Sequence, residues 1–231
     1  MGSSRFPGKP LARINGVPML AWVYRAATMA LSIDQTYVAT ADNEIIEYCE
    51  REQMRFMATS PACRTGTLRV ADAAGQLALD PMDVVLNVQG DEPMLRSEWL
   101  NDLAAKFRDP SVNLASLCFR PEGAHYLTDR NRVKVLMGRT NVALFFGREI
   151  RTSIPVWEHF RQHIGVYGFR AMVLERIKKM DPDTDLEQRP WVRAEWNIHM
   201  VEIPDETIAV DTPADLKMAT AALAARAGNS A

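Results

Sequence analysis

The sequence is poor in cysteine, has no long apolar run and carries no excess of charge of either sign. Its three cysteines, Cys49, Cys63 and Cys118, are odd in number and far apart, which suits free thiols in a reducing compartment better than a disulfide framework or a zinc site. No stretch approaches the roughly 20 apolar residues that cross a bilayer, so we expect no membrane insertion. The first residues also lack the apolar core of a secretory signal, and we therefore expect a cytoplasmic protein.

The charge balance excludes a further class of partners. The net charge of −2 comes from 27 basic and 29 acidic side chains, and no polybasic run stands out. This argues against a protein that binds nucleic acid or anionic membranes through charge alone. The 47% hydrophobic and 24% charged content is that of a folded globular chain, and 231 residues suit one domain covering residues 1–231.

Strand-like and helix-like patterns alternate along the chain, which favours an α/β layered fold. Helical patterns cover residues 18–31, 66–79, 171–180 and 186–196, with others beginning near residues 43, 97 and 213. Strand patterns cover residues 36–40, 55–58, 84–88, 114–119, 133–136, 142–146, 164–169 and 198–203. The run at 84–88 is almost wholly apolar, as expected of a central parallel strand covered on both faces. The closely spaced strands at about 120–170 suggest an inserted, more antiparallel β element.

Two ends of the chain carry marked local signals. The loop Ser3-Ser4-Arg5-Phe6-Pro7-Gly8-Lys9 combines small residues with two cations ahead of a helix, as in loops that wrap a polyphosphate, although a solvated basic turn has the same composition. It is not a Walker A loop. Near the other end, Thr212, Pro213 and Asp215 have the spacing of a helix cap and capping box.

Two aspartates stand where a cation could bind. Asp91 lies in the turn Gly90-Asp91-Glu92-Pro93 directly after the apolar strand, and ligands bind beyond the carboxyl ends of strands in open α/β sheets. Carboxylates there suit Mg²⁺, although an ordinary strand-to-turn segment has the same residues. Asp211 precedes the last helix, where a carboxylate also stabilises the helix electrostatically without any ligand.

Two further segments are glycine-bracketed. The loop Thr65-Gly66-Thr67 with Arg69 allows close approach to a nucleotide. His163 precedes an apolar strand and is open to two interpretations, a hydrogen-bonded structural histidine or a substrate ligand. The histidines have no HxxxH or cysteine partners, and no GxSxG or cysteine–histidine nucleophile pattern is present, so neither a zinc site nor covalent catalysis is indicated.

Taken together and in order, these segments resemble the CMP-KDO synthetase family, the 3-deoxy-manno-octulosonate cytidylyltransferases. The matching segments are SSRFPGKPL, RTGTLR, LNVQGDEPML, NRVKV, HIGVYGFR, LEQ at 186–188 and VDTPADL. The resemblance implies a Rossmann-like nucleotidyltransferase fold with a mainly parallel sheet, flanking helices and an inserted β element for dimerisation. It also implies the reaction of CTP with a sugar acid to give a CMP-sugar and pyrophosphate, in lipopolysaccharide biosynthesis, by a cytoplasmic homodimer.

The resemblance assigns roles to residues of this chain. It implies Lys9, Asp91 and Asp211 as catalytic residues, with Mg²⁺ held by the two aspartates. The nucleotide-binding residues that it implies are Ser4, Arg5, Lys9, Thr65, Gly66, Thr67 and Arg69. The residues that it implies for the sugar acid are Gln89, Lys134, His163, Tyr167, Glu187 and Gln188.

Three features depart from the family pattern. An acidic residue of the family is replaced by Leu68, a serine by Thr65, and an arginine by Pro190. The family also has a hydrophobic strand ending in arginine ahead of the first loop, and we expect a chain extended by that strand to be more stable and more active. Two alternatives stay open. The chain could activate another acid, such as a modified octulosonate, a nonulosonate or a phosphonate, or it could be a non-catalytic nucleotide-binding paralogue.

Overall fold

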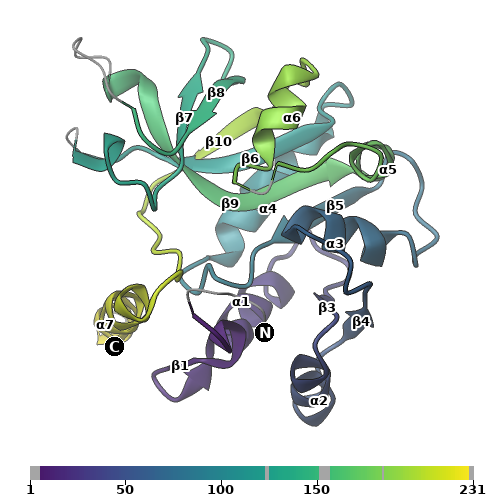
Figure 1. Ribbon diagram of the computed structural model, residues 1–231, viewed down its shortest axis with the longest axis vertical. Coiled ribbons are helices and arrows are strands. Elements are labelled where there is room, and N and C mark those ends of the chain that lie inside the picture. The colour runs from purple at the N-terminus through teal and green to yellow at the C-terminus, as the bar shows by residue number, and fades with distance from the viewer. Residues whose placement is uncertain (1–5, 123–124, 151–156, 184, 229–231) are drawn as a thin grey trace. The chain divides into compact units, whose positions relative to one another are not determined.

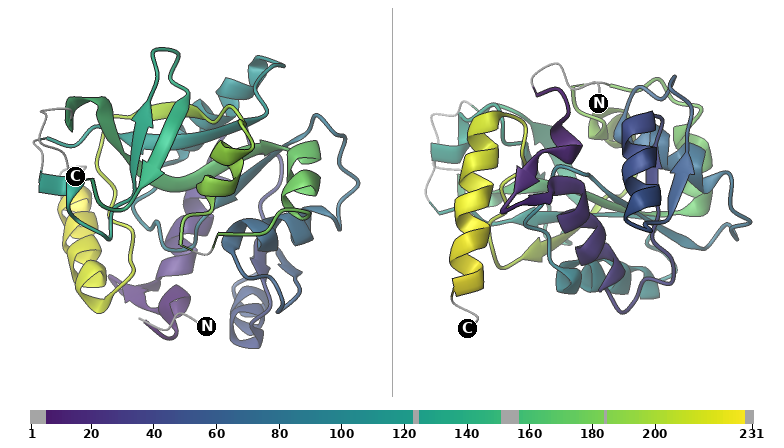
Figure 2. Two further views of the ribbon diagram at one scale, coloured as in Figure 1. Left: turned by 45° about the horizontal axis from the view of Figure 1, so that its top comes forward. Right: turned by 90° about the horizontal axis from the view of Figure 1, so that it is seen from below.

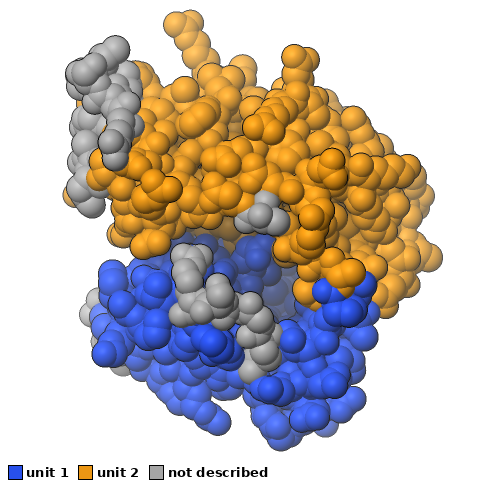
Figure 3. All heavy atoms as spheres, in the orientation of Figure 1, with its two compact units in different colours: residues 1–61, 88–101, 207–231 blue, residues 62–87, 102–206 orange. Residues whose placement is uncertain are grey.

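The computed structural model describes residues 6–122, 125–150, 157–183 and 185–228 (Figure 1). Within it the chain forms two compact units, each assembled from separate stretches of sequence (Figure 3). Unit 1 comprises residues 1–61, 88–101 and 207–231, and unit 2 comprises residues 62–87 and 102–206. The two are described one at a time.

Unit 1 opens with short turns and a hairpin. The 3₁₀ turn η1 (Lys9–Leu11) precedes β1 (Arg13–Ile14) and β2 (Val17–Pro18), which pair antiparallel. Asn15 and Gly16 connect them with φ angles of 49° and 81°, and an Asn-Gly pair tolerates the left-handed backbone that such a two-residue turn requires. The hairpin leads directly into the first helix.

The remaining elements of unit 1 surround that helix, α1 (Met19–Thr28). The strands β3 (Val38–Thr40) and β4 (Phe56–Ala58) pair in parallel on either side of α2 (Asn43–Arg51) in the sequence. The last helix is α7 (Pro213–Gly228). One buried cluster joins α1 to β3 and α2, and another joins Met19 and Ile14 to Ala219 and Leu223 of α7. The apolar residues of α1 therefore serve two cores.

Unit 2 is built around a mixed sheet with the strand order β10-β6-β9-β7-β8, and β5 also pairs with β9. The strands are β5 (Val84–Val88), β6 (Leu114–Phe119), β7 (Lys134–Met137), β8 (Ala143–Gly147), β9 (Phe160–Arg170) and β10 (His199–Ile203). β10 runs parallel to β6, whereas the β6–β9, β7–β9 and β7–β8 pairs are antiparallel. Figures 1 and 2 show β7 and β8, in teal, side by side.

Three short helices lie in unit 2: α3 (Gly66–Ala74), α5 (Ala171–Ile177) and α6 (Gln188–Arg193). α3 packs against α5, and α6 packs against β8. Another helix, α4 (Ser97–Ala105), spans the boundary between the units in the sequence. The main core of unit 2 contains a group of aromatic rings. The Trp191 ring lies nearly perpendicular to the rings of Tyr167 and Phe169, and the ring centroids are 5.4 and 5.6 Å apart. Tyr167 and Phe169 belong to β9, so this core packs against the strand that also carries the candidate site residue His163.

The structure confirms the α/β class and most of the predicted elements, with three corrections. The sheet is mixed rather than mainly parallel. The 84–88 strand is not central: it lies off the main strand path, and Val84 is 37% exposed. An apolar, β-branched run has the same pattern whether one or two neighbouring strands cover it, so composition overstated its burial. The helices predicted at 66–79, 171–180 and 186–196 are also shorter than expected. That the chain is one domain stays a prediction.

Candidate functional site

Three charged side chains from distant parts of unit 1 meet at one point. The Lys9 ammonium donates to Asp91 Oδ2 at 2.8 Å and to Asp211 Oδ1 at 3.2 Å. The two carboxylate oxygens therefore lie within about 6 Å of each other, the two distances taken together, although the residues are 120 positions apart in the sequence. The predicted proximity of Asp91 and Asp211 is confirmed.

The backbone of each loop explains why these side chains converge. Gly8 adopts φ 73°, a left-handed conformation that favours glycine. This residue turns the chain into η1, and Lys9 is the first residue of that turn. The amide of Val210 donates to the carbonyl of Asp91 at 2.8 Å, which fastens the two aspartate loops together. The predicted capping box forms: Asp215 Oδ2 accepts from the Thr212 amide at 2.8 Å, and Thr212 Oγ1 accepts from the Asp215 amide at 3.3 Å.

The charges of this cluster stabilise one another. The side chains of Lys9, Asp91 and Asp211 are 13%, 27% and 26% exposed. Burial by itself lowers the pKa of Lys9, but the two carboxylates outweigh it and raise the pKa above the ordinary 10.5. Lys9 is thus a permanent cation between two anions.

The same cluster has the oxygen donors that a hard divalent cation needs. Mg²⁺ binds through one or two carboxylates and completes its shell with water and substrate phosphates. Asp91 and Asp211 already share one cationic group, so their geometry fits such an ion. No set of three or more His, Cys, Asp or Glu side chains with metal-binding geometry occurs in the described parts of the chain, and within those parts Asp91 and Asp211 are the two carboxylates that would hold such an ion.

The predicted nucleotide loop lies at the beginning of α3 in unit 2. Thr65 is the N-cap of α3, and its Oγ1 accepts the Leu68 amide at 3.2 Å. Thr67 is 1% exposed, and its hydroxyl donates to Glu187 Oε2 at 2.7 Å. Arg69 Nη2 donates to the carbonyl of Cys63 at 3.5 Å, which holds the arginine beside the loop. Ser4 and Arg5 lie outside the described residues.

His163 is enclosed in unit 2. Its Nε2 is 2.9 Å from Ser116 Oγ, and this hydroxyl lies 2.8 Å from the carbonyl of Val166. The Ser116 hydroxyl donates its one proton to the Val166 carbonyl, so it can only accept a hydrogen bond from His163. His163 Nε2 is therefore the donor, and the ring is the neutral Nε2–H tautomer. Burial lowers the pKa of His163 to about 3. These contacts favour the structural interpretation.

Lys134 has its donors occupied within unit 2. It is fully buried, and its ammonium donates to the carbonyls of Asp129, Arg132 (2.7 Å) and Arg148 (2.6 Å). Burial lowers the pKa of Lys134 to about 8, so the protonated form still prevails at neutral pH. The three carbonyls match the three N–H groups of the ammonium, which indicates a residue that organises this loop.

The other predicted sugar-acid residues differ in how many of their polar groups have hydrogen-bond partners within the protein. Gln188 is 4% exposed and donates to the Tyr167 hydroxyl, whereas its Oε1 is buried and accepts no hydrogen bond from the described residues. Glu187 receives both the amide and the hydroxyl of Thr67. Gln89 belongs to unit 1, and its carbonyl accepts the Glu92 amide at 3.3 Å.

Comparison with known proteins decides the family. Residues 1–195 match the family model described as cytidylyltransferase. The chain is 37% identical to the 3-deoxy-manno-octulosonate cytidylyltransferase of Myxococcus xanthus over 98% of this chain and 94% of the relative. The chain belongs to the cytidylyltransferase family.

Two further comparisons, one with a relative by sequence and one with a solved structure, agree with this family. It is 36% identical to the 8-amino-3,8-dideoxy-manno-octulosonate cytidylyltransferase of Shewanella baltica, over 94% of this chain and 92% of the relative. Among solved structures, CMP:2-keto-3-deoxy-manno-octonic acid synthetase complexed with CTP matches with a TM-score of 0.88 and 30% identity, covering 97% of this chain and 95% of that one. The nucleotidyltransferase fold is therefore confirmed.

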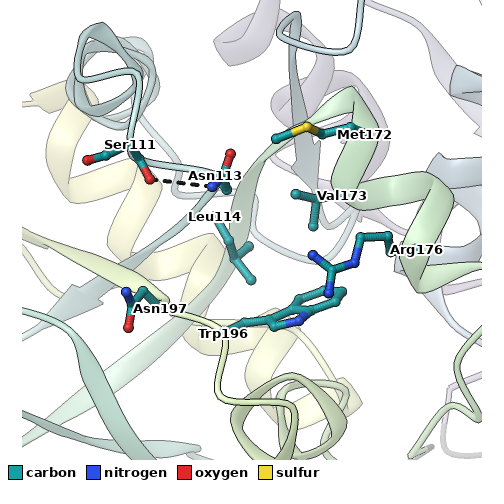
Figure 4. Close-up of a pocket in the computed structure, with 8 residues that line it drawn as sticks. All are labelled: Ser111, Asn113, Leu114, Met172, Val173, Arg176, Trp196 and Asn197. Carbon is teal, nitrogen blue, oxygen red and sulfur yellow. Dashed lines mark hydrogen bonds between the residues drawn. The ribbon is translucent and has the colours of Figure 1, made fainter.

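The sequence departures in this cytidylyltransferase lie together. Leu68 and Pro190 line the same small cavity of about 20 Å³, between the beginnings of α3 and α6, and Thr65 and Glu187 border it too. A second cavity of about 190 Å³ in unit 2 is lined by residues of α5, the start of β6 and the segment before β10 (Figure 4). There the Arg176 guanidinium stacks over the Trp196 ring at 4.6 Å. None of the predicted site residues lines this second cavity.

Sequence reasoning missed two functional neighbours. Asn87, inside the NVQGDEP segment, is 2% exposed and donates to Thr67 Oγ1 at 3.1 Å. Ser116 fixes the tautomer of His163. A polar residue within an otherwise apolar strand was the available signal for Asn87, because a buried amide needs a partner.

In the described part of the chain, no helix has the length and apolar character required to cross a membrane.

Proposed function

We propose that the chain transfers CMP from CTP to 3-deoxy-manno-octulosonate or a close derivative and releases pyrophosphate. The observation that carries this is the Lys9–Asp91–Asp211 cluster, in a cytidylyltransferase with relatives named for that acid. The fold and the solved relative complexed with CTP support the nucleotide. A non-catalytic paralogue has no need to keep a lysine and two aspartates convergent from three distant segments.

The reaction that this proposal describes is a displacement at phosphorus. The anomeric hydroxyl of the sugar acid forms a bond to the α-phosphorus of CTP while the bond to the bridging oxygen of pyrophosphate breaks, and the proton of the hydroxyl is released to solvent. Such a transfer depends mainly on positioning and charge neutralisation. Lys9 carries the positive charge that stabilises the phosphates, and Arg5 of the same loop would add to it.

Asp91 and Asp211 would hold Mg²⁺ in this proposal. The chemistry that the ion supplies at such a site is neutralisation of phosphate charge and orientation of the reacting oxygens. Asp211 is held in place by the cap of α7, and Asp91 by its carbonyl bond to Val210. The aspartates therefore stand ready without rearrangement of their loops.

For the sugar acid we propose Tyr167 and Gln188 of unit 2 as direct contacts. The buried Oε1 of Gln188 is an acceptor for a substrate hydroxyl, and the Tyr167 hydroxyl is its immediate neighbour. His163 and Lys134 support this region through their contacts with Ser116 and with three backbone carbonyls. The 8-amino derivative is a second candidate substrate, because relatives of similar identity carry that name.

We propose a homodimer through the β7–β8 pair. β8 is the last strand on the sheet path, and Leu144 and Phe145 on it are 57% and 47% exposed. A strand edge with large exposed apolar side chains is a pairing surface. Replacing both residues with serine would convert a dimer to a monomer in sedimentation experiments, and an unchanged mass would refute this interface.

The test of function is pyrophosphate release from CTP across a panel of acids. The panel contains the octulosonate, its 8-amino derivative, a nonulosonate and a phosphonate, each with and without Mg²⁺, and UTP and ATP replace CTP in parallel. We expect activity with CTP, Mg²⁺ and an octulosonate. Asp91→Ala and Asp211→Ala should each lower turnover roughly a hundredfold or more, as expected for loss of a metal ligand. The exposed Asp34→Ala serves as the control.

Three results would contradict parts of the proposal. Faster release with UTP or ATP would overturn the choice of nucleotide. Full activity in EDTA, or near-normal turnover of either aspartate variant at saturating Mg²⁺, would remove the metal. Release with none of the acids, by a protein that binds CTP, would favour the non-catalytic alternative.

A further inference from the structure

In unit 2 two buried polar side chains, Asn87 and Thr67, and the half-buried carboxylate of Glu187 form a continuous chain of hydrogen bonds centred on Thr67. Asn87 Nδ2 donates to Thr67 Oγ1 at 3.1 Å, and Thr67 Oγ1 donates to Glu187 Oε2 at 2.7 Å. The Thr67 amide donates to the other oxygen, Glu187 Oε1, at 3.3 Å. The carboxylate of Glu187 therefore accepts both donors of one residue, 120 positions away in the sequence.

The direction of each bond follows from the donors available. Thr67 has one hydroxyl proton, and the carboxylate can only accept, so this proton goes to Glu187 and the hydroxyl oxygen accepts from Asn87. Thr67 and Asn87 are 1% and 2% exposed. Removing one member would leave a buried polar group without its partner, which is costlier than replacing both.

The three members belong to segments with different proposed roles. Thr67 lies in the loop proposed for the nucleotide, Glu187 immediately precedes Gln188 of the sugar-acid residues, and Asn87 lies two residues before Gln89. Helix capping explains the amide contacts, since Thr65 accepts the Leu68 amide and Glu187 accepts the Thr67 amide, but it does not explain the bonds of the Thr67 hydroxyl to Glu187 and Asn87. The added carboxylate is also the charge that a helix N-terminus favours, so the contact is strong.

We propose that Glu187 is a positioning residue for the nucleotide, acting through Thr67 with Asn87 as the second support, rather than a ligand of the sugar acid. This rests on the proposed function. Because both carboxylate oxygens are engaged by Thr67, Glu187 holds the nucleotide loop in its binding geometry. The side chain that follows it, Gln188, keeps an acceptor for the sugar acid.

The experiment measures the affinity for CTP by calorimetry without sugar acid, and then the KM values of both substrates. Glu187→Gln and Thr67→Val should each raise the Kd of CTP roughly tenfold, the size expected for losing a hydrogen bond to a charged group. The KM of the sugar acid should change less than the Kd of CTP. The double variant should bind CTP about as tightly as the single variant with the higher Kd, because both substitutions remove the same contact. Thr67→Ser keeps the hydroxyl and should restore binding.

Matched controls are Glu175→Gln on the exposed face of α5 and Thr140→Val on an exposed turn. If Glu187→Gln raised the KM of the sugar acid alone, and Thr67→Val did not, Glu187 would be a sugar ligand and the inference would be wrong. Lower melting temperature and kcat with an unchanged Kd for CTP would indicate a purely structural role and would also overturn it. Absence of CTP binding by the unaltered protein would instead refute the proposed function.

Should Thr67→Val fail to fold, Asn87→Asp provides the second variant. It removes the amide donor to Thr67 Oγ1 while keeping the size of the side chain. The inference requires that Asn87→Asp weaken CTP binding more than sugar-acid binding, in the same direction as Glu187→Gln. Equal affinity for CTP in these two variants and in the unaltered protein would refute it.

Discussion

Replacing Lys9 with methionine tests the charge arrangement of the proposed active site directly. Methionine keeps much of the length of the lysine side chain but removes the ammonium that donates to Asp91 and Asp211. The two carboxylates would then lose the ammonium that they share, in a region where all three side chains are less than one third exposed. We expect Lys9→Met to lower both stability and turnover.

The magnitude follows from the separation of the two carboxylates. Two like charges at most about 6 Å apart repel by about 3 kcal/mol or more at an effective dielectric constant of about 20. Part of this is relieved by salt and by movement of the side chains, so we expect a loss of about 2–3 kcal/mol in the free energy of unfolding near pH 7. A second substitution, Asp91→Asn, removes one of the two charges and should recover most of the loss.

Urea denaturation at low ionic strength measures these differences, with Lys217→Met on the exposed side of α7 as the control. Mg²⁺ should raise the unfolding midpoint of Lys9→Met, because an ion that binds only the folded state stabilises it. A loss below about 0.5 kcal/mol, the size typical of surface substitutions, would refute the reasoning. So would a double variant that is no more stable than Lys9→Met.

Two further predictions concern unit 2. Because the folded pKa of His163 is about 3 against 6.5 when unfolded, its contribution is complete above pH 6.5 and is lost as the pH falls, by about 1.4 kcal/mol per pH unit. Urea midpoints at pH 7.5 and 5.5 should show this loss, and His163→Gln should abolish that part of it; an equal pH dependence in both proteins would contradict the prediction. Gly168→Ala should cost about 1–3 kcal/mol, since an added Cβ would lie 2.8 Å from Phe107 Cζ and 3.2 Å from Leu86 Cδ2. At Gly138 the nearest atoms are 3.6 Å away, so Gly138→Ala should have little effect, and equal melting temperatures of the two variants would refute the packing argument.

Local signals in the sequence predicted local structure well. The residues Thr212, Pro213 and Asp215 predicted the beginning of α7, and the capping box forms between them as expected. The strand at 114–119 has the predicted bounds. These features depend on residues a few positions apart, whose spacing is visible in the sequence. The resemblance to known cytidylyltransferases added the identities of Lys9, Asp91 and Asp211, which periodicity alone could not have singled out.

Patterns were less informative about strand position and helix ends. The 84–88 run predicted a central strand, whereas β5 lies off the main strand path. The helix expected at 66–79 ends at Ala74, with Gly75 as its C-cap. An apolar run reports only that burial is favourable. It does not report which neighbouring strand supplies the burial, because that depends on contacts between residues far apart in the chain.

The sequence by itself determined the α/β class, the cytidylyltransferase family and the set of polar residues available for chemistry. Only the tertiary structure decided how those residues are used. It places the ammonium of Lys9 between two aspartates, occupies Lys134 with three backbone carbonyls, and turns Glu187 toward Thr67. The physical reason is that a hydrogen bond is made or lost over a few tenths of an ångström. Its partners are therefore set by the packing of whole elements rather than by the residues beside it in the sequence.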